Sequence, residues 1–143
     1  MITIEATGLT DGSARGSLAV LTQPLSLWGG LDLESGVICD STHPQAGLCL
    51  AGRVLAMTAA RGSSSSSSAL VEAIRRGTAP VAIVLVRPDP ILLIGSLVAA
   101  DLYGRETPVV TVRDRGWDAL ADGAEVLVES RAGRATLSIG ERT

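Results

Sequence analysis

The stretch with the clearest chemical potential is a short turn, Arg61-Gly62-Ser63, whose serine opens a run of six serines. A helix that begins in such a run leaves its first backbone amides unpaired, and these amides attract an anion together with the helix dipole. Arg61 adds a guanidinium whose planar fork suits carboxylate or phosphate, and Gly62 allows a bend that a side chain would resist. The turn therefore predicts a site for an acidic ligand.

Two apolar segments flank the serines. The residues that follow position 50 have the pattern of a buried strand, and residues 69–76 place Leu70, Val71 and Ile74 on one helical face. A serine run is also typical of a flexible linker, and a serine at a helix start is often only a cap. Because the run is short and lies directly between two periodic segments, we favour a strand, turn and helix over a linker.

Two other segments carry candidates for the surroundings of a ligand. The paired glycines Gly29 and Gly30 suggest backbone held close to another group, although a surface turn explains them equally well. His43 precedes a proline, which keeps its backbone out of the helical region. No second histidine or carboxylate cluster lies beside it, so we interpret His43 as structural or substrate-adjacent. A catalytic role stays open, because histidine suits proton transfer near neutrality.

The amino-acid composition limits the classes of function that the chain can have. At 143 residues the chain fits one domain, residues 1–143, and 46% hydrophobic with 19% charged residues excludes a disordered chain. A net charge of -3 and few aromatic residues argue against nucleic-acid binding. Every basic side chain apart from the histidine is arginine, which removes Schiff-base chemistry and the lysine of a phosphate-binding loop.

The two cysteines, Cys39 and Cys49, lack the spacing of zinc or iron–sulfur ligands, so we expect no metal bound by this chain. The N-terminus begins with strand-like alternation instead of a signal peptide. The most apolar segment is too short to cross a membrane, which takes about 20 residues. We therefore expect a cytoplasmic protein with reduced thiols and no membrane partner.

The order of predicted elements sets the fold class. Residues 2–6 and 17–22 are expected to form an opening hairpin, and residues 37–40 a short strand. After the serine-led helix the pattern predicts a strand at 81–86, a helix at 91–103 capped by Asp89 and Pro90, a strand at 108–112, a helical turn at 117–121 and strands at 124–129 and 135–139. This order indicates an α/β domain with a β-rich N-terminal part and a central mixed or parallel sheet flanked by helices. Ligands of open sheets lie at the carboxyl ends of strands, where the Arg-Gly-Ser turn is expected.

Several motifs occur in a particular order between residue 28 and about residue 112: Trp28-Gly29-Gly30-Leu31-Asp32, His43-Pro44 with Gly47, Leu50-Ala51-Gly52-Arg53-Val54-Leu55, Arg61-Gly62-Ser63 with Ser66, and Pro90-Ile91-Leu92 with Gly95, Val98, Ala99 and Ala100. In this order they resemble the small subunit, or C-terminal swivelling domain, of the aconitase X dehydratases. The resemblance implies a swivelling β/β/α fold, like the mobile last domain of aconitase, which closes over a larger partner that carries an iron–sulfur cluster. The chain departs from the family at Ala59-Ala60, where Gly-Gly or Gly-Lys is common, and the serines after Ser63 leave the register of the secondary serines open.

The resemblance also implies roles for single residues. Ser63 becomes the catalytic base or proton acceptor. The helix-start site for substrate or anion then comprises Arg61, Gly62, Ser64 and Ser66, and the residues expected beside the substrate are Gly29, Gly30, Asp32 and His43.

The expected function is that of a small subunit of a two-chain hydro-lyase, inactive without its large subunit, which would hold the iron–sulfur cluster. The family includes cis-3-hydroxy-L-proline dehydratases and mevalonate 5-phosphate dehydratases, and an arginine-only, alanine-rich composition typical of GC-rich bacteria favours the first. The alternatives are a non-catalytic anion-binding or interaction module and, less favoured, a serine hydrolase. The hydrolase is disfavoured because the turn is not Gly-x-Ser-x-Gly and the chain has one histidine.

Overall fold

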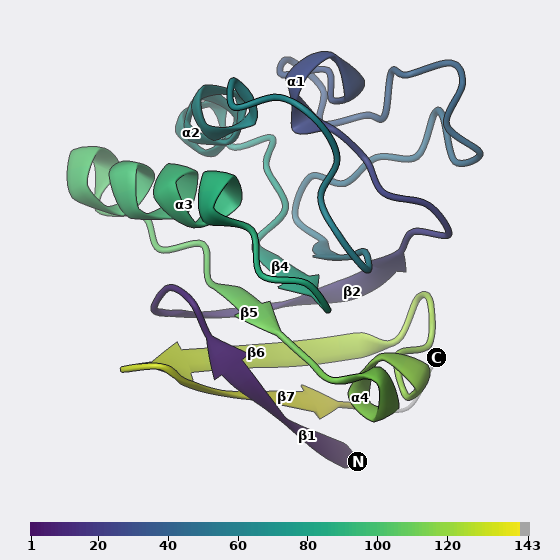
Figure 1. The fold of residues 1–143 in the computed structure, drawn as a ribbon, viewed down its shortest axis with the longest axis vertical. Helices are drawn as coiled ribbons and strands as arrows, with labels where there is room; N and C mark the ends of the chain where they lie inside the picture. Colours follow the sequence, from purple (N-terminus) through teal and green to yellow (C-terminus); the bar gives the residue numbers. More distant parts are fainter. Residues whose placement is uncertain (141–143) are drawn as a thin grey trace.

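In the computed structural model, which describes residues 1–140, seven strands form one sheet that closes into a barrel in the order β1-β5-β4-β3-β2-β6-β7 (Figure 1). The strands are β1 (Ile2–Gly8), β2 (Gly12–Val20), β3 (Val54–Ala56), β4 (Ala82–Leu85), β5 (Val109–Thr111), β6 (Glu125–Arg131) and β7 (Arg134–Ile139). Parallel pairing joins β2, β3, β4 and β5, and the other neighbours pair antiparallel. Two longer helices, α2 (Ser66–Arg76) and α3 (Pro90–Tyr103), lie side by side on the barrel, whereas α1 (Leu27–Gly30) and α4 (Asp114–Asp118) are short. The predicted α/β class, with parallel strands and flanking helices, is confirmed.

The central strands are buried on both faces. In β3, Val54 and Ala56 point into the barrel, while Leu55 points toward the helices, and Ile83 of β4 does the same. The layer between barrel and helices also receives Leu70 of α2. Because both faces are covered, these strands show a continuous apolar run in the sequence instead of alternation.

Caps fix the ends of the two long helices. Asp89 Oδ1 accepts a hydrogen bond from the amide of Ile91 at 2.9 Å, as predicted for the start of α3. Gly77 ends α2 with φ +76°, also as predicted. Gly95 lets the helices approach closely, since a Cβ there would come within 2.9 Å of the carbonyl oxygen of Ser67.

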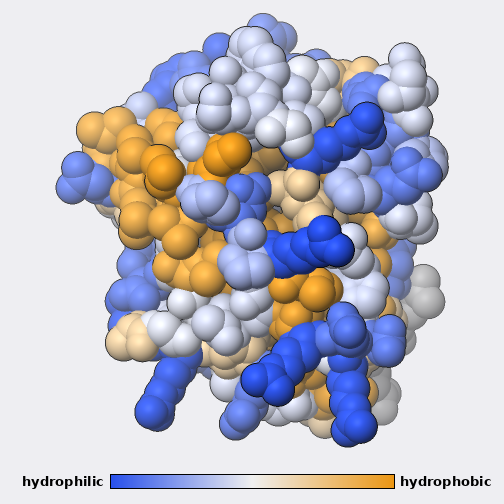
Figure 2. Space-filling view, in the orientation of Figure 1, coloured by the Kyte–Doolittle hydropathy of each residue, from blue (hydrophilic) through white to orange (hydrophobic). Residues whose placement is uncertain are grey.

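The outer face of α3 is apolar. Five of its large hydrophobic side chains are exposed, and Figure 2 shows hydrophobic surface gathered over this helix: Ile94, Leu97, Val98, Leu102 and Tyr103. Among residues 1–140, no helix has the length and apolar character needed to cross a membrane.

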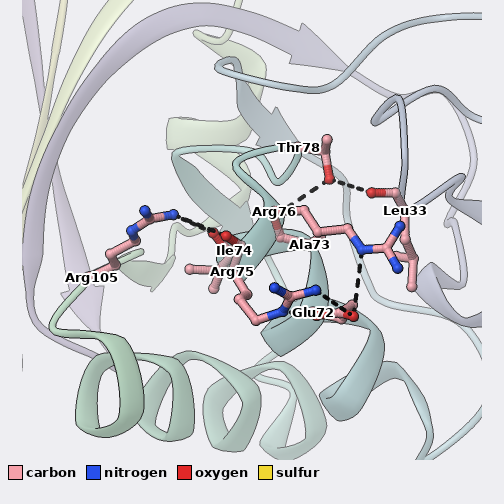
Figure 3. Close-up of polar contacts among 8 residues, drawn as sticks. All are labelled: Leu33, Glu72, Ala73, Ile74, Arg75, Arg76, Thr78 and Arg105. Atoms are coloured by element: carbon pink, nitrogen blue, oxygen red, sulfur yellow. Dashed lines mark hydrogen bonds and ion pairs between the residues drawn. The ribbon is translucent and has the colours of Figure 1, made fainter.

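The C-terminal end of α2 is held by polar contacts (Figure 3). Arg75 and Arg76 form ion pairs with Glu72 one turn earlier. Arg105, which follows α3, donates to the carbonyl oxygen of Ile74 at 2.8 Å. Thr78 Oγ1 donates to the carbonyl oxygen of Leu33 at 2.7 Å, and this bond ties the helix end to the loop at residues 31–53. These contacts fix α2 at the end opposite its serines.

The predicted hairpin of the first two strands is wrong. β1 pairs with β5 and β7, whereas β2 pairs with β3 and β6. The chain does turn near Gly12, but the amides of Leu9 and Thr10 bond to the carbonyl oxygen of Val109 in β5. This contact directs the two strands to different neighbours.

Three further expectations need correction. The sheet closes into a barrel instead of remaining open. Residues 37–40 form only isolated bridges, Leu31 with Ile38 and Val37 with Cys49. The helical turn expected at 117–121 is α4, which begins at Asp114. The sequence did not predict the sheet closure or the bridges at residues 37–40, because pairing with segments distant in the sequence determines both.

A buried hydroxyl cluster joins α3 to the barrel. Ser96 Oγ donates to the carbonyl oxygen of Thr107 at 2.6 Å and lies 2.9 Å from Thr10 Oγ1, which accepts from the amide of Val109 at 2.8 Å. All of these groups are out of solvent, so losing one partner leaves the others unsatisfied.

We expect Ser96→Ala to lower the free energy of unfolding by about 1–3 kcal/mol, because it leaves buried polar groups unpaired. Chemical denaturation monitored by circular dichroism measures the change. The matched control is Ser13→Ala at an exposed position of β2, and equal stability of the two variants would contradict a structural role for Ser96.

Candidate functional site

A pocket of about 280 Å³ lies where the chain leaves β3 and β4. The two strands are parallel neighbours, so the segments that follow them meet at one edge of the barrel. The pocket is lined by Ala59, Ala60, Arg61, Gly62, Ser63, Ser66, Arg87, Pro88, Asp89 and Ile91. The Arg-Gly-Ser turn therefore lies at the carboxyl end of a strand, as the sequence indicated.

Ser63 lies in a turn just before α2. Its Oγ accepts a hydrogen bond from the amide of Ser65 at 3.1 Å, and its carbonyl oxygen accepts from the amide of Ser66 at 3.0 Å. The helix itself begins at Ser66, and the residue at its cap position, Ser65, makes no side-chain cap bond. The side-chain cap expected from the serine run is therefore not formed, and the half-buried Ser63 instead closes the turn before the helix through its bond to the Ser65 amide.

Ser66 joins the serine turn to the loop around Trp28. Its side chain is buried, and its Oγ accepts from the amide of Trp28 at 3.2 Å and lies 3.5 Å from Ser26 Oγ. Gly62 takes φ +91°, and a Cβ there would lie 3.1 Å from Ser26 Oγ. A residue with a side chain at position 62 would be strained in its backbone and crowded by this loop, so the turn requires glycine.

Arg61 places a positive charge beside the turn, near Asp40. The Thr42 side chain donates to Asp40 Oδ1 at 2.6 Å and the Thr42 amide donates at 2.9 Å. These bonds hold the pKa of the Asp40 carboxyl below its ordinary value, and the nearby charge of Arg61 lowers it further. Asp40 therefore remains ionised and offsets part of the charge of Arg61.

The other predicted residues lie outside the pocket lining. Gly29 and Gly30 belong to α1 next to the Trp28 amide that Ser66 holds. Asp32 Oδ1 accepts from the amide of Glu34 at 2.9 Å. Their position beside a substrate stays a prediction.

His43 is buried, and both of its ring nitrogens have backbone partners. Nε2 donates to the carbonyl oxygen of Gln23 and Nδ1 accepts from the amide of Gln45, each at 3.0 Å. This arrangement favours the structural interpretation over a catalytic one. Ser64 is exposed, and its carbonyl oxygen accepts from the amide of Ser67 at 3.3 Å, so its hydroxyl stays a candidate only.

Sequence reasoning missed two residues of the pocket. Asp89 was recognised as a helix cap, and Arg87 was not singled out at all, yet both line the pocket with Ser63. A usable signal was present, because Arg87 closely follows a buried strand, as Arg61 does. If those two strands are parallel neighbours, both arginines must lie at the same edge.

A larger hollow, of about 670 Å³, lies elsewhere on the barrel, between β1, β2, β6 and β7. Glu129 and Arg131 line it, but it lacks a serine turn backed by a helix. We take the smaller pocket as the candidate site because Ser63, the turn that carries it and two arginines line it.

An iron–sulfur cluster does not fit the described part of this chain. Among residues 1–140, no three His, Cys, Asp or Glu side chains gather as a ligand set. Cys39 Sγ contacts the carbonyl oxygen of Gly29 at 3.5 Å, and Cys49 Sγ contacts that of Ser35 at 3.6 Å, so each thiol lies against backbone. Two exposed cysteines without further ligands cannot hold such a cluster.

Comparison with known proteins points to one family. A family model described as the aconitase X swivel domain matches residues 3–138. A cis-3-hydroxy-L-proline dehydratase of Pseudomonas aeruginosa is 43% identical over 122 residues, which cover 80% of this chain and 21% of that protein. A phosphomevalonate dehydratase small subunit of Methanosarcina acetivorans is 29% identical over 136 residues, covering 93% of this chain and 90% of that subunit.

The fold comparison agrees. The crystal structure of Thermococcus kodakaraensis aconitase X in its holo-form superimposes with a TM-score of 0.85 at 26% identity, covering 99% of this chain and 100% of that one. The share of each relative that the chain covers differs. It spans about a fifth of the length of two cis-3-hydroxy-L-proline dehydratases, one of P. aeruginosa and one of Hypocrea jecorina.

We expect Thr42→Val to raise the pKa of Asp40, because the variant loses the side-chain hydrogen bond to the ionised carboxylate. A carboxyl whose pKa is lowered on folding stabilises the fold above its unfolded pKa, and this contribution is lost as the pH falls through the folded pKa. In the variant this contribution should therefore be smaller, and its loss should be complete at a higher pH than in the wild type, still below the ordinary aspartate pKa of about 3.9.

An NMR titration of the Asp40 carboxyl carbon in both proteins measures this shift. Thr42→Ser, which keeps the hydroxyl, is the matched control and should titrate like the wild type. An unchanged Asp40 titration in Thr42→Val would show that the hydroxyl does not hold the carboxylate.

Proposed function

Because this chain belongs to the aconitase X swivel domain family, whose curated relatives are dehydratases, we propose that it is the small subunit of a two-chain hydro-lyase acting on a small hydroxy acid. The substrate we propose is cis-3-hydroxy-L-proline, which would give Δ1-pyrroline-2-carboxylate. The observation that carries the proposal is the position of Ser63, in one pocket with two arginines and with its Oγ facing a backbone amide.

Elimination of water from such an acid has two requirements. A base must take the proton from the carbon next to the carboxylate, and hydroxide must leave the neighbouring carbon. In our proposal Ser63 Oγ takes the proton from C2, the electron pair left behind forms the C2–C3 double bond, and hydroxide leaves C3. The resulting enamine acid then tautomerises to the Δ1 imine.

An ordinary serine hydroxyl is too weak a base, so its alkoxide must be favoured by the surroundings. The amide of Ser65 already points at Ser63 Oγ, and one donor of this kind is worth about 3–4 kcal/mol when it faces a developing oxyanion. The positive charge of Arg61 in the same pocket wall acts in the same direction. The turn thus supplies a preorganised environment for the alkoxide.

The departure of hydroxide needs a Lewis acid, and the described cysteines and carboxylates do not form a site for one. We therefore propose that a large aconitase-X-like subunit holds the iron–sulfur cluster, and that this chain is inactive without it. The M. acetivorans relative, named a small subunit and covered over 90% of its length, supports a separate partner. A cytoplasmic location remains part of this proposal.

The apolar outer face of α3 supports a partner on this side of the molecule. α3 begins at the pocket, because Ile91 lines it, and the exposed Ile94, Leu97 and Leu102 continue from there (Figure 2). Exposed apolar patches of this kind mark interaction sites. A subunit that closes over the pocket would cover the helix as well.

A second substrate fits the same chemistry. Mevalonate 5-phosphate is also a 3-hydroxy acid, and the small-subunit relatives are named for a phosphomevalonate dehydratase. The two proposals differ only in the acid that the assembled enzyme turns over. The remaining alternative is a module that binds an anion through the backbone amides without turnover.

The base assignment predicts that Ser63→Ala, co-expressed with the large subunit, loses about 10²–10⁴-fold in kcat. Product formation is followed with each of the two acids. The matched control is Ser68→Ala, an exposed serine of the same run whose Oγ donates to the carbonyl oxygen of Ser65. Undiminished turnover in Ser63→Ala would refute the base, and acid binding without turnover in the wild type would favour the anion-binding module.

The interface assignment predicts that Leu97→Glu abolishes co-purification with the large subunit, since Leu97 is 52% exposed on α3 and would place a charge in the apolar contact. Ile2→Glu introduces the same charge at a similarly exposed apolar residue of β1 and should leave the complex intact. Size-exclusion chromatography of the co-expressed chains distinguishes them. A stable complex with Leu97→Glu would move the interface away from α3.

A further inference from the structure

Arg87 lines the same pocket as the Arg-Gly-Ser turn. It follows β4 and precedes the cap of α3, and its amide donates to the carbonyl oxygen of Thr58 at 2.9 Å. The amide of Val86 donates to the same oxygen at 3.0 Å. The segment that carries Arg87 is therefore tied directly to the segment that leads into Ser63.

The two pocket arginines differ in position. Neither forms an ion pair among residues 1–140, but Arg61 belongs to the serine turn itself and lies on the side of Asp40. The carboxylate in the lining, Asp89, already accepts from the amide of Ile91. Within residues 1–140, no carboxylate oxygen lies within 4 Å of the Arg87 guanidinium. Arg87 therefore offers a guanidinium to whatever enters the pocket.

We propose that Arg87 binds the carboxylate of the substrate and so determines that the enzyme accepts small carboxylic acids. This inference rests on the proposed function, because it assigns a role within the same pocket. A guanidinium fork matches the two oxygens of a carboxylate, and its charge offsets that of the carboxylate next to the carbon that loses the proton. Arg61, beside the turn, is then left to favour the alkoxide of Ser63.

This division of roles has a kinetic signature. Arg87 contacts the carboxylate both before and during proton removal, so its loss weakens binding more than it slows turnover. We expect Arg87→Gln to raise KM at least tenfold while kcat falls less than tenfold. Arg87→Lys keeps the charge but loses the fork, so it should recover part of the affinity. Because Arg87 is exposed, neither variant removes a packing contact of the core.

The test uses the co-expressed two-subunit complex and measures equilibrium binding by calorimetry as well as turnover. L-proline and mevalonate 5-phosphate are the probes, and L-prolinamide, which lacks the carboxylate, is the matched ligand. The matched protein control is Arg115→Gln in α4, an exposed arginine outside the pocket. For the acid that binds the wild type, we expect Arg87→Gln to lower the affinity at least tenfold. Arg115→Gln should keep the affinity within threefold of the wild type. Any affinity for L-prolinamide should be the same in Arg87→Gln and in the wild type.

Two results would overturn the inference separately from the proposed function. If the wild type turns over its acid and Arg87→Gln keeps the same KM and affinity, Arg87 does not bind the carboxylate although the enzyme assignment stands. If Arg87→Gln weakens L-prolinamide as much as the acid, its effect is not specific to the carboxylate. If the wild-type complex binds neither probe acid and dehydrates neither cis-3-hydroxy-L-proline nor mevalonate 5-phosphate, the proposed function fails and this inference fails with it.

Discussion

The site depends on the parallel pairing of β3 with β4. Val54 is in register with Ala82 and Ala56 with Val84, so both strands end at the same edge of the barrel. Just beyond this edge, the carbonyl oxygen of Thr58 accepts the amides of the first two residues after β4. One backbone oxygen thus holds together the two segments that supply the pocket. If the register between β3 and β4 shifted, Ser63 and Arg87 would lie on separate loops and would not line one pocket.

The serine run shows how identical residues acquire different roles. Ser63 Oγ faces a backbone amide at the pocket, Ser66 Oγ is buried and holds the Trp28 loop, and Ser67 Oγ donates to the carbonyl oxygen of Ile91 at 2.6 Å. The last bond ties α2 to the first turn of α3, and Gly95 in the next turn lets the two helices approach closely. A flexible linker would make none of these contacts. The run is therefore a structural junction between the turn and two helices.

The pocket combines a serine hydroxyl, which accepts a hydrogen bond from a backbone amide and which we propose as the proton acceptor, with two arginines, but the described residues form no metal site. An elimination that expels hydroxide needs both functions close together. The helix α3, which starts at the pocket, also exposes an apolar face. We therefore expect the proposed large subunit to bind on the side of the molecule where the pocket lies. Family membership agrees with this arrangement, because the matched relatives include both single long chains and separate small subunits.

The sequence alone determined the features that depend on local chemistry. These were the Asp89 cap, the glycine that ends α2, the doubly buried strands and the Arg-Gly-Ser turn, because capping, backbone freedom and burial on both faces leave direct patterns in the residue order. The family resemblance was also readable, since it rests on ordered motifs. Tertiary structure decided which strands pair, and it replaced the expected hairpin and open sheet with a closed barrel. It also decided which serine is buried and that Arg87 shares the pocket with Ser63, because contacts between residues distant in sequence depend on strand register and helix packing, which no local pattern encodes.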